Sequence, residues 1–197
     1  MHRSSLEHMQ ILADRFLKDR GGSSLSVLDI GSYDVNGSYK PIFERIKASY
    51  IGLDLSSGPN VDVVLKSPYQ FPLGSNAFDV VVSGQAFEHV EFFWLTWHEM
   101  VRVTKPGGLL FLIAPSRGPE HRYPQDCWRF YPDGYRALAK LGRCELLEVT
   151  ADWGPHPDPD SAVWGDCVGV FRKPPRSLKG KVADMVRTLG HKLCTLP

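Results

Sequence analysis

Residues 120–131, EHRYPQDCWRFY, crowd charged, aromatic and proline side chains into one short segment. His121 could act as a general base with Asp126 as its orienting partner, or Asp126 could bind substrate hydroxyls. An ordered loop of hydrogen-bonding groups and aromatic faces is what recognition of a polyhydroxylated substrate requires. A structural alternative stays open, in which the rings cover the end of a sheet and Arg129 pairs with Asp126 or Asp133. The candidate substrate contacts in this segment are Tyr123, Trp128 and Arg129.

A glycine-containing turn, DIGSYDVNG, follows an apolar segment near the start of the chain. Asp54 lies 23 residues after Gly31 and follows a second apolar segment. An acid at this place fits the pairing of a carboxylate with the vicinal ribose hydroxyls of an adenosine cofactor. A glycine turn after a strand is common and often has only a structural role. The spacing between Gly31 and Asp54 favours the cofactor-binding interpretation.

The turn lacks the G-x-G-x-x-G pattern that brings the backbone against the pyrophosphate of a dinucleotide. Asp29 precedes its first glycine, and bulky residues stand at positions 33–35, where a pyrophosphate needs small ones. An acid in that place repels phosphate but accepts hydrogen bonds from a cationic amino-acid group. The turn therefore favours S-adenosylmethionine over a dinucleotide.

Apolar segments alternate with helical patterns along the chain, which is typical of a parallel α/β sheet. We predict a Rossmann-like, doubly wound, mostly parallel seven-stranded sheet with a C-terminal antiparallel hairpin. The sequence KPGG at 105–108 is expected to break a helix over residues 91–104, and a Pro- and Gly-rich loop at 154–165 to join the hairpin strands. The expected strands cover residues 25–29, 49–57, 61–65, 78–84, 108–116, 144–153 and 166–173, and the other expected helices cover residues 6–17, 41–47 and 132–141.

Charge is distributed unevenly along the 197 residues. The 23 Lys and Arg against 22 Asp and Glu give a net charge of +1, too little to draw the chain onto nucleic acid by counterion release. Residues 174–197 carry five basic residues and one acid, so this tail is +4 and the body is −3. We therefore expect a domain at 1–173 and a basic amphipathic helix at 174–197. This helix would pack on the body or on a second subunit in a homodimer, with a membrane surface or an acidic partner as the alternative.

Cysteine spacing and hydropathy exclude several classes of protein. No CxxC pair is present, which disfavours a structural zinc site and favours reduced thiols. No stretch approaches the ~18 apolar residues of a membrane span, and the first residues carry charges throughout, unlike a signal peptide. These features predict a cytoplasmic location. A carboxylate and a histidine could together bind Mg²⁺, although nothing in the spacing demands a metal. The cysteines are Cys127, Cys144, Cys167 and Cys194.

Four motifs in order, VLDIGSYDVNGSY, YIGLDLSSG, FPLGSNAFDVVVSGQAFEHV and VRVTKPGGLLFLIAPS, resemble class I S-adenosylmethionine-dependent methyltransferases. The resemblance covers residues 25–116 and implies that the turn at Asp29 faces the methionine part of the cofactor, while Asp54 faces the ribose and adenine. The family often has an acid near Ser67 that contacts the adenine amino group, so here the Ser67 hydroxyl or a backbone group would replace it. The implied cofactor residues are Asp29, Gly31, Ser32, Tyr33, Asp54, Leu55, Ser67, Ser83 and Gln85.

The residues after the fourth expected strand separate the branches of this family. Nucleic-acid amino-methyltransferases carry a D/N-P-P-Y/F signature there, whereas this chain has SGQA at 83–86, which counts against base methylation. The next residues, FEHV, resemble the small-molecule branch. His89 lies near the expected methyl-transfer point but can equally be a structural histidine bonded to backbone, and Glu88 is a weaker candidate base.

The pattern H-x-x-P-x-D-x-W-R-F at residues 121–130 resembles loops of small bacterial methyltransferases associated with sugar and polysaccharide modification. Among these, the pattern is similar to mycobacterial 1-O-methyltransferases of methylmannose polysaccharide synthesis. It implies O-methylation of a hydroxyl of a sugar or oligosaccharide. N- or C-methylation of another small metabolite, and a binding module that has lost catalysis, are the alternatives. Trp153 could stack on a sugar ring, whereas Trp164 is expected to cover the hairpin.

Overall fold

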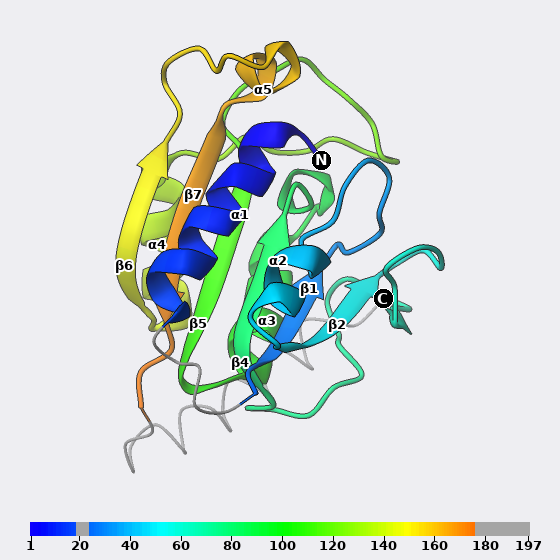
Figure 1. Ribbon diagram of the computed structural model, residues 1–197, viewed down its shortest axis with the longest axis vertical. Helices are drawn as coiled ribbons and strands as arrows, with labels where there is room; N and C mark the ends of the chain where they lie inside the picture. The colour runs from blue at the N-terminus through cyan, green and yellow to red at the C-terminus, as the bar shows by residue number, and fades with distance from the viewer. Residues whose placement is uncertain (19–23, 176–197) are drawn as a thin grey trace.

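A single seven-stranded sheet forms the centre of the molecule (Figure 1). The computed structural model describes residues 1–18 and 24–175. The strands are β1 (Ser26–Ile30), β2 (Ser49–Asp54), β3 (Val63–Val64), β4 (Phe78–Gly84), β5 (Thr104–Pro115), β6 (Glu145–Ala151) and β7 (Asp166–Arg172). Their order in the sheet is β3-β2-β1-β4-β5-β7-β6; the first five are parallel, and β7 runs antiparallel to β5 and β6. The predicted sheet, with its antiparallel C-terminal strands, is confirmed.

The central strands are apolar on both faces because helices cover both sides. One face carries α1 (Arg3–Phe16) and α2 (Lys40–Arg45), and the other carries α3 (Phe93–Val103) and α4 (Pro132–Gly142) (Figure 1). On β4, Val80 and Val82 belong to the buried cluster that includes Phe43 of α2. Val81 belongs to the opposite cluster, which includes Trp97 of α3. The continuous apolar run of this strand therefore serves two separate cores.

Three local features differ from the sequence-based expectation. The third strand is only Val63–Val64, and the expected loop at 154–165 contains a short helix, α5 (Pro159–Trp164). The side chain of Asp158 starts α5 by accepting a hydrogen bond from the Ser161 N–H at 2.9 Å. KPGG lies inside β5 and does not form a separate turn, because α3 ends at Val103 and the strand begins at the next residue. A register shift between β4 and β5 accommodates this early start, with Gly107 at a φ of +80°.

Some expectations concern segments that the structure does not describe. The basic helix and its role as a dimer contact fall mainly on residues 176–197, outside the described residues, as does Cys194. Within residues 1–18 and 24–175, no helix combines the length and the apolarity that a membrane crossing needs.

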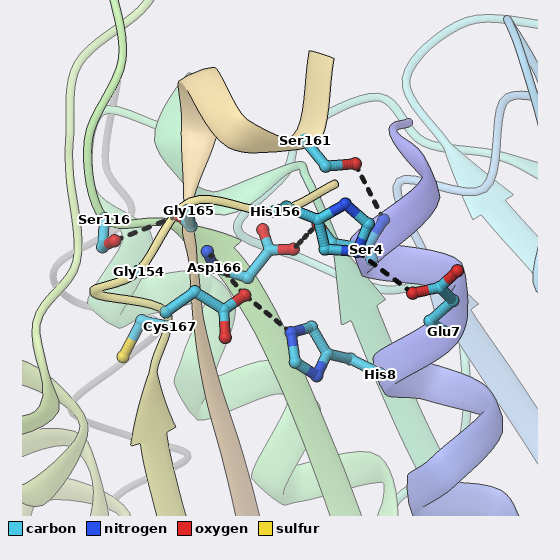
Figure 2. A network of polar contacts seen from close by, with 12 residues as sticks. Ser4, Glu7, His8, Ser116, Gly154, His156, Ser161, Gly165, Asp166 and Cys167 are labelled. Atoms are coloured by element: carbon cyan, nitrogen blue, oxygen red, sulfur yellow. Dashed lines mark hydrogen bonds and ion pairs between the residues drawn. The ribbon is translucent and has the colours of Figure 1, made fainter. Parts of the chain in front are cut away.

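Polar contacts fasten the start of α1 to the hairpin end of the sheet. His8 Nε2 lies 2.7 Å from a carboxylate oxygen of Asp152, and Ser4 Oγ donates to Asp166 at 2.7 Å. The backbone N–H of Ser4 also donates to Ser161 Oγ of α5 at 3.0 Å. Figure 2 shows Ser4 and His8 on one helix face, turned toward Asp166 and Ser161. The first helix is therefore positioned by charged groups as well as by its apolar face.

The contact between His8 and Asp152 predicts a pH-dependent stability. Burial alone would lower the pKa of His8, but the hydrogen bond to Asp152 and the negative charges of Asp152, Asp166 and Glu7 together outweigh it and raise this pKa. Burial alone would likewise raise the pKa of Asp152, but the hydrogen bond and the charge of His8, with smaller contributions, together lower it. The histidine's contribution is complete below its unfolded pKa of ~6.5 and is lost as pH rises through the raised folded value. We expect His8→Gln to lower the melting temperature by ~2–4 °C at pH 5.5 and by less at pH 8.5. Thermal unfolding at the two pH values checks this, and an equal effect at both would contradict it.

Candidate active site

The carboxyl ends of the parallel strands lie along one edge of the sheet, where such sheets bind ligands. Four loops leave this edge, at residues 31–39 after β1, 55–62 after β2, 85–92 after β4 and 116–131 after β5. Every candidate site residue except Asp29, Asp54, Ser67, Ser83 and Trp153 lies in one of these loops. The fold therefore gathers most of the predicted site residues at one edge.

Asp54, at the end of β2, ties the first two loops together. Its carboxylate accepts hydrogen bonds from the backbone N–H of Tyr33 at 3.1 Å and of Ser56 at 3.0 Å. A carboxylate can accept about four hydrogen bonds, so lone pairs remain for ribose hydroxyls. Leu55 follows with a side chain 50% exposed, an apolar surface beside the carboxylate.

Gly31 is required where it stands. Its φ is +79°, and a Cβ there would lie 2.5 Å from the Cβ of Ala86 in the loop after β4. The N–H groups of Gly31 and Ser32 both donate to the carbonyl of Leu53, at 2.9 and 3.2 Å. The turn after β1 is thus held against β2 and against the loop after β4.

Asp29 is buried beneath this turn. Its carboxyl accepts a hydrogen bond from the hydroxyl of Tyr50 on β2, and the same hydroxyl accepts one from Asn60 at 2.9 Å. Burial raises the pKa of Asp29 to about 7, against the opposing effect of the Tyr50 hydrogen bond. The hydrogen bond from Tyr50 occupies one of the two carboxyl oxygens of Asp29.

The polar side chains among the other predicted cofactor residues also bind the protein. The hydroxyls of Ser32 and Ser83 donate to the carbonyls of Asn60 and Ile30, at 3.0 and 2.9 Å. Gln85, at a φ of +56°, donates to Asp166 at 2.8 Å. Ser67 Oγ accepts the N–H of Tyr69 at 3.3 Å. Each of these four side chains therefore makes a hydrogen bond within the protein.

Glu88, His89 and His121 come together between the loops after β4 and β5. Glu88 and His89 lie on a 3₁₀ turn, η2 (Phe87–His89), and one Glu88 carboxylate oxygen is 3.6 Å from His89 Nε2. The rings of His89 and His121 are 4.8 Å apart between centroids. Backbone contacts hold the loops together, since the carbonyl of Glu88 accepts the N–H groups of Cys127 at 2.7 Å and of Trp128 at 3.2 Å.

The hydrogen bonds of His89 define its tautomer. Nδ1 lies 2.6 Å from the carbonyl oxygen of Gln125, which can only accept, so Nδ1 carries the hydrogen. Burial lowers the pKa of His89, with the Gln125 contact opposing, which favours the neutral ring. Its Nε2 lone pair therefore faces the Glu88 carboxyl. His89 is thus bonded to backbone, as the structural interpretation requires, and also keeps a free lone pair in the cluster.

Glu88 is the most perturbed carboxyl of the cluster. Its side chain is 1% exposed, and its Oε2 has no hydrogen-bond partner among the described residues. Burial raises its pKa to about 8, against the effect of a backbone hydrogen bond. Displaced pKa values of this kind are typical of functional sites. Glu88, which the sequence ranked behind the histidines, is therefore a central member of the site.

Asp126 is in the opposite state. Its carboxylate accepts two hydrogen bonds from the Arg129 guanidinium, at 2.6 and 2.8 Å, and one from the backbone N–H of His121 at 2.7 Å. The Arg129 hydrogen bonds hold the pKa of Asp126 well below its usual range. As a base Asp126 would be weak, which argues against this sequence-based candidate, whereas the expected pairing with Arg129 is confirmed. Asp126 Oδ2 lies 3.3 Å from His121 Nδ1, which suits an orienting role.

The surroundings of Trp153 and Trp164 differ from those that the sequence predicts. The ring of Trp164 lies 4.4 Å from that of His121 and 5.6 Å from the guanidinium carbon of Arg129, so it borders the cluster as well as the hairpin. Trp153 instead stacks on Tyr131, with ring centroids 6.1 Å apart at an angle of 9°. Both rings of this pair are more than half exposed. The ring of Tyr123 lies 6.4 Å from the His89 ring.

Comparison with known proteins adds to this geometry. Residues 28–112 match the family model described as a methyltransferase domain. This part of the chain is therefore similar to methyltransferase domains. An uncharacterized methyltransferase of Mycobacterium leprae strain Br4923 is 28% identical over 182 residues, 81% of this chain and 65% of the relative. Another, from Mycobacterium sp. strain KMS, is 33% identical over 109 residues, 48% of this chain and 42% of the relative. The chain thus spans less than two thirds of the length of either relative.

Solved structures share the fold of this chain. The 1,6-didemethyltoxoflavin-N1-methyltransferase of Burkholderia thailandensis, solved with its substrate and S-adenosylhomocysteine, has a TM-score of 0.65 at 16% identity, covering 87% of this chain and 80% of its own. The [4+2]-cyclase SpnF has a TM-score of 0.64 at 15% identity, covering 87% and 82%. Proteins described as a methyltransferase and as a cyclase therefore share this architecture, so the acceptor must be argued from the site.

The burial of Glu88 predicts a cost to the stability of the fold. A carboxyl whose folded pKa lies above its unfolded value destabilises the fold as pH rises between the two, here from ~4.5 to about 8. We expect Glu88→Gln to melt higher than the wild type in chelator-containing buffer, by a margin that grows over this pH range and then levels off. Differential scanning fluorimetry checks this, with Glu91→Gln, an exposed residue of the same loop, as the control. A lower melting temperature for Glu88→Gln at pH 8 would contradict the argument.

Proposed function

We propose that the chain is an S-adenosylmethionine-dependent O-methyltransferase that acts on a hydroxyl of a sugar or oligosaccharide. The carrying observation is the cluster of Glu88, His89 and His121 at the sheet edge, beside a loop of aromatic and charged residues. A buried carboxyl and two imidazoles facing one point suit an acceptor that must lose a proton.

The cofactor would bind across the ends of β1 and β2. Asp54 would accept the ribose hydroxyls with its remaining lone pairs, and Leu55 would cover the adenine with its exposed side chain. The turn from Gly31 to Tyr33 would bring its backbone to the methionine part, next to the buried Asp29. This assignment places the sulfonium between the first loop and the loop that carries Glu88.

Methyl transfer is an in-line displacement. The hydroxyl oxygen attacks the methyl carbon, the carbon–sulfur bond breaks with its electron pair passing to sulfur, and the hydroxyl proton must leave. Holding the three atoms in line supplies roughly 7–11 kcal/mol, and removing the proton adds roughly 10²- to 10⁴-fold. The cluster of Glu88, His89 and His121 would promote loss of that proton.

The acceptor would be held by the loop at 116–131. The Arg129 and Asp126 pair stiffens this loop, and Tyr123 presents an exposed ring close to His89. Trp128 donates its indole N–H to the Val90 carbonyl at 3.0 Å, so it contributes its ring face only. The stacked and exposed Trp153 would extend the surface for an oligosaccharide. A narrower proposal within this class is 1-O-methylation in methylmannose polysaccharide synthesis.

Cofactor binding tests the first half of the proposal. Saturating S-adenosylhomocysteine should raise the melting temperature of the wild type, since a ligand at 100 times its dissociation constant stabilises the fold by ~2.7 kcal/mol. Asp54→Ala should weaken binding by ~10-fold or more in calorimetry, because it removes the ribose acceptor and loosens the Tyr33 backbone. Glu44→Gln, an exposed residue of α2, is the matched control. No binding of S-adenosylmethionine or S-adenosylhomocysteine to the wild type would overturn the assignment.

Turnover tests the second half. We expect methyl transfer to mono- or oligosaccharides, partly methylated ones included, in a screen that also offers amines. His121→Ala and His89→Ala should each lower kcat by ~10²- to 10⁴-fold while S-adenosylhomocysteine binding is kept. His156→Ala supplies the same substitution outside the cluster, where the ring pairs with Glu7. Activity on amines alone would refute the sugar proposal, and normal turnover in either cluster variant would clear that histidine.

A further inference from the structure

We propose that Glu88, His89 and His121 form a binding site for one divalent cation of the d-block, such as Zn²⁺, Fe²⁺ or Mn²⁺. Each residue offers one ligand atom, and the three atoms all lie within 4.8 Å of one another. Binding of the ion stands on this geometry alone, whereas its use in the reaction rests on the proposed function.

The spacing is close to that of a formed site. Ligand atoms ~2.0–2.2 Å from a common ion lie at most ~4.4 Å apart. The Glu88 oxygen and His89 Nε2, at 3.6 Å, already meet this limit. Small rotations of the three side chains would bring the remaining atoms within it.

The contacts of His89 are those of a metal ligand. A metal-binding imidazole usually donates its other ring N–H to a carbonyl or carboxylate, which fixes the ring and the tautomer. His89 does this through Nδ1 and the Gln125 carbonyl, and the Gln125 side chain returns a hydrogen bond to the His89 carbonyl at 2.9 Å. The Nε2 lone pair is left for the ion.

Glu88 supplies the second, independent observation. Its Oε2 is buried and has no hydrogen-bond partner among the described residues. A buried carboxylate needs a compensating charge or it must take up a proton. Within the described part of the chain no Lys or Arg lies within ion-pair distance of it, the charge of Arg129 acts on it only at longer range, and its one ion-pair contact is His89. A cation bound between the imidazoles would provide that charge.

The ligand set decides the class of ion. Imidazole nitrogens suit zinc, iron and other d-block ions, whereas Mg²⁺ favours oxygen ligands in a strict octahedron. Two histidines and one carboxylate therefore argue for a d-block ion over Mg²⁺. Three protein ligands also leave coordination positions open, as in catalytic sites. An acceptor hydroxyl could take one of them.

A second group of this type, His8, Asp152 and Asp166, lies near the start of α1 and serves as a contrast. Its carboxylates are already used, since Asp152 pairs with His8 and Asp166 accepts hydrogen bonds from Ser4 and Gln85. An ion there would have to displace these partners. We therefore assign no metal to it.

At the Glu88 site the ion would act on the acceptor. A hydroxyl oxygen that donates a lone pair to the cation loses its proton more easily, and water takes up that proton. The resulting alkoxide oxygen attacks the methyl carbon, and the carbon–sulfur electron pair passes to sulfur. The Glu88 and histidine ligands would hold the ion and the oxygen in place.

Cobalt titration of the chelator-stripped full chain tests the site. We expect one Co²⁺ per chain, with the visible absorption of a four- or five-coordinate ion, and one Zn²⁺ in calorimetry with a micromolar or tighter dissociation constant. Glu88→Gln and His121→Ala should each weaken binding by ~10- to 100-fold. His8→Gln should bind as the wild type does, and Mg²⁺ should bind far more weakly than Zn²⁺. Circular dichroism confirms that each variant is folded.

The outcomes separate the two proposals. Absence of one-to-one binding, or loss of binding in His8→Gln but not in Glu88→Gln, would overturn the metal site. S-adenosylhomocysteine binding is measured on the same stripped samples. Retained cofactor binding without metal binding would refute the metal site alone, whereas metal binding without cofactor binding would refute the methyltransferase assignment alone.

Discussion

The buried carboxylate of Asp166 constrains the edge of the sheet that carries the candidate site. It is fully buried at the start of β7, where it pairs in register with Pro115 at the end of β5. Because an isolated buried charge is costly, donors must converge on it. They come from His2 and Ser4 at the start of α1 and from Gln85 after β4, at distances between 2.7 and 3.0 Å. One charge thus fixes the first helix, the β4 loop and the hairpin relative to one another.

A second contact extends this constraint into the core. Tyr39, fully buried before α2, shares a hydrogen bond of 2.6 Å with Ser5 of α1. Its ring lies so close to Gly84 at the end of β4 that a Cβ there would come within 1.8 Å of the Tyr39 hydroxyl. The glycine before Gln85 is therefore required for the tyrosine to reach α1. Because β4 ends at Gly84, η2 begins three residues later, and this fixes the position of Glu88.

Sequence patterns predicted the sheet because its signals are local. The apolar run at 78–84 and the glycine turn that follows β1 are each specified by neighbouring residues. Both fall where the sequence predicted them. The start of β5 was missed because proline and glycines indicate a turn, whereas pairing of Thr104 with Phe78 decides the outcome. In the candidate site, His89 and His121 were predicted because histidine is a common general base. Asp166 and Trp164 were missed because their partners lie far away in sequence, and the signal for Asp166 was only a lone acid beginning a buried strand.

Two carboxyl groups beside His121 show why residue type alone could not assign roles. Asp126 meets Arg129 three positions later in its own loop, so it stays charged and serves to hold the loop. Glu88 has no arginine within ion-pair distance, and Arg129 of the loop after β5 acts on it only at longer range. Groups whose environments push their pKa values apart take different tasks. The carboxyl paired with arginine holds the loop, and the buried one without an ion-pair partner of this kind is where an added proton or cation would bind.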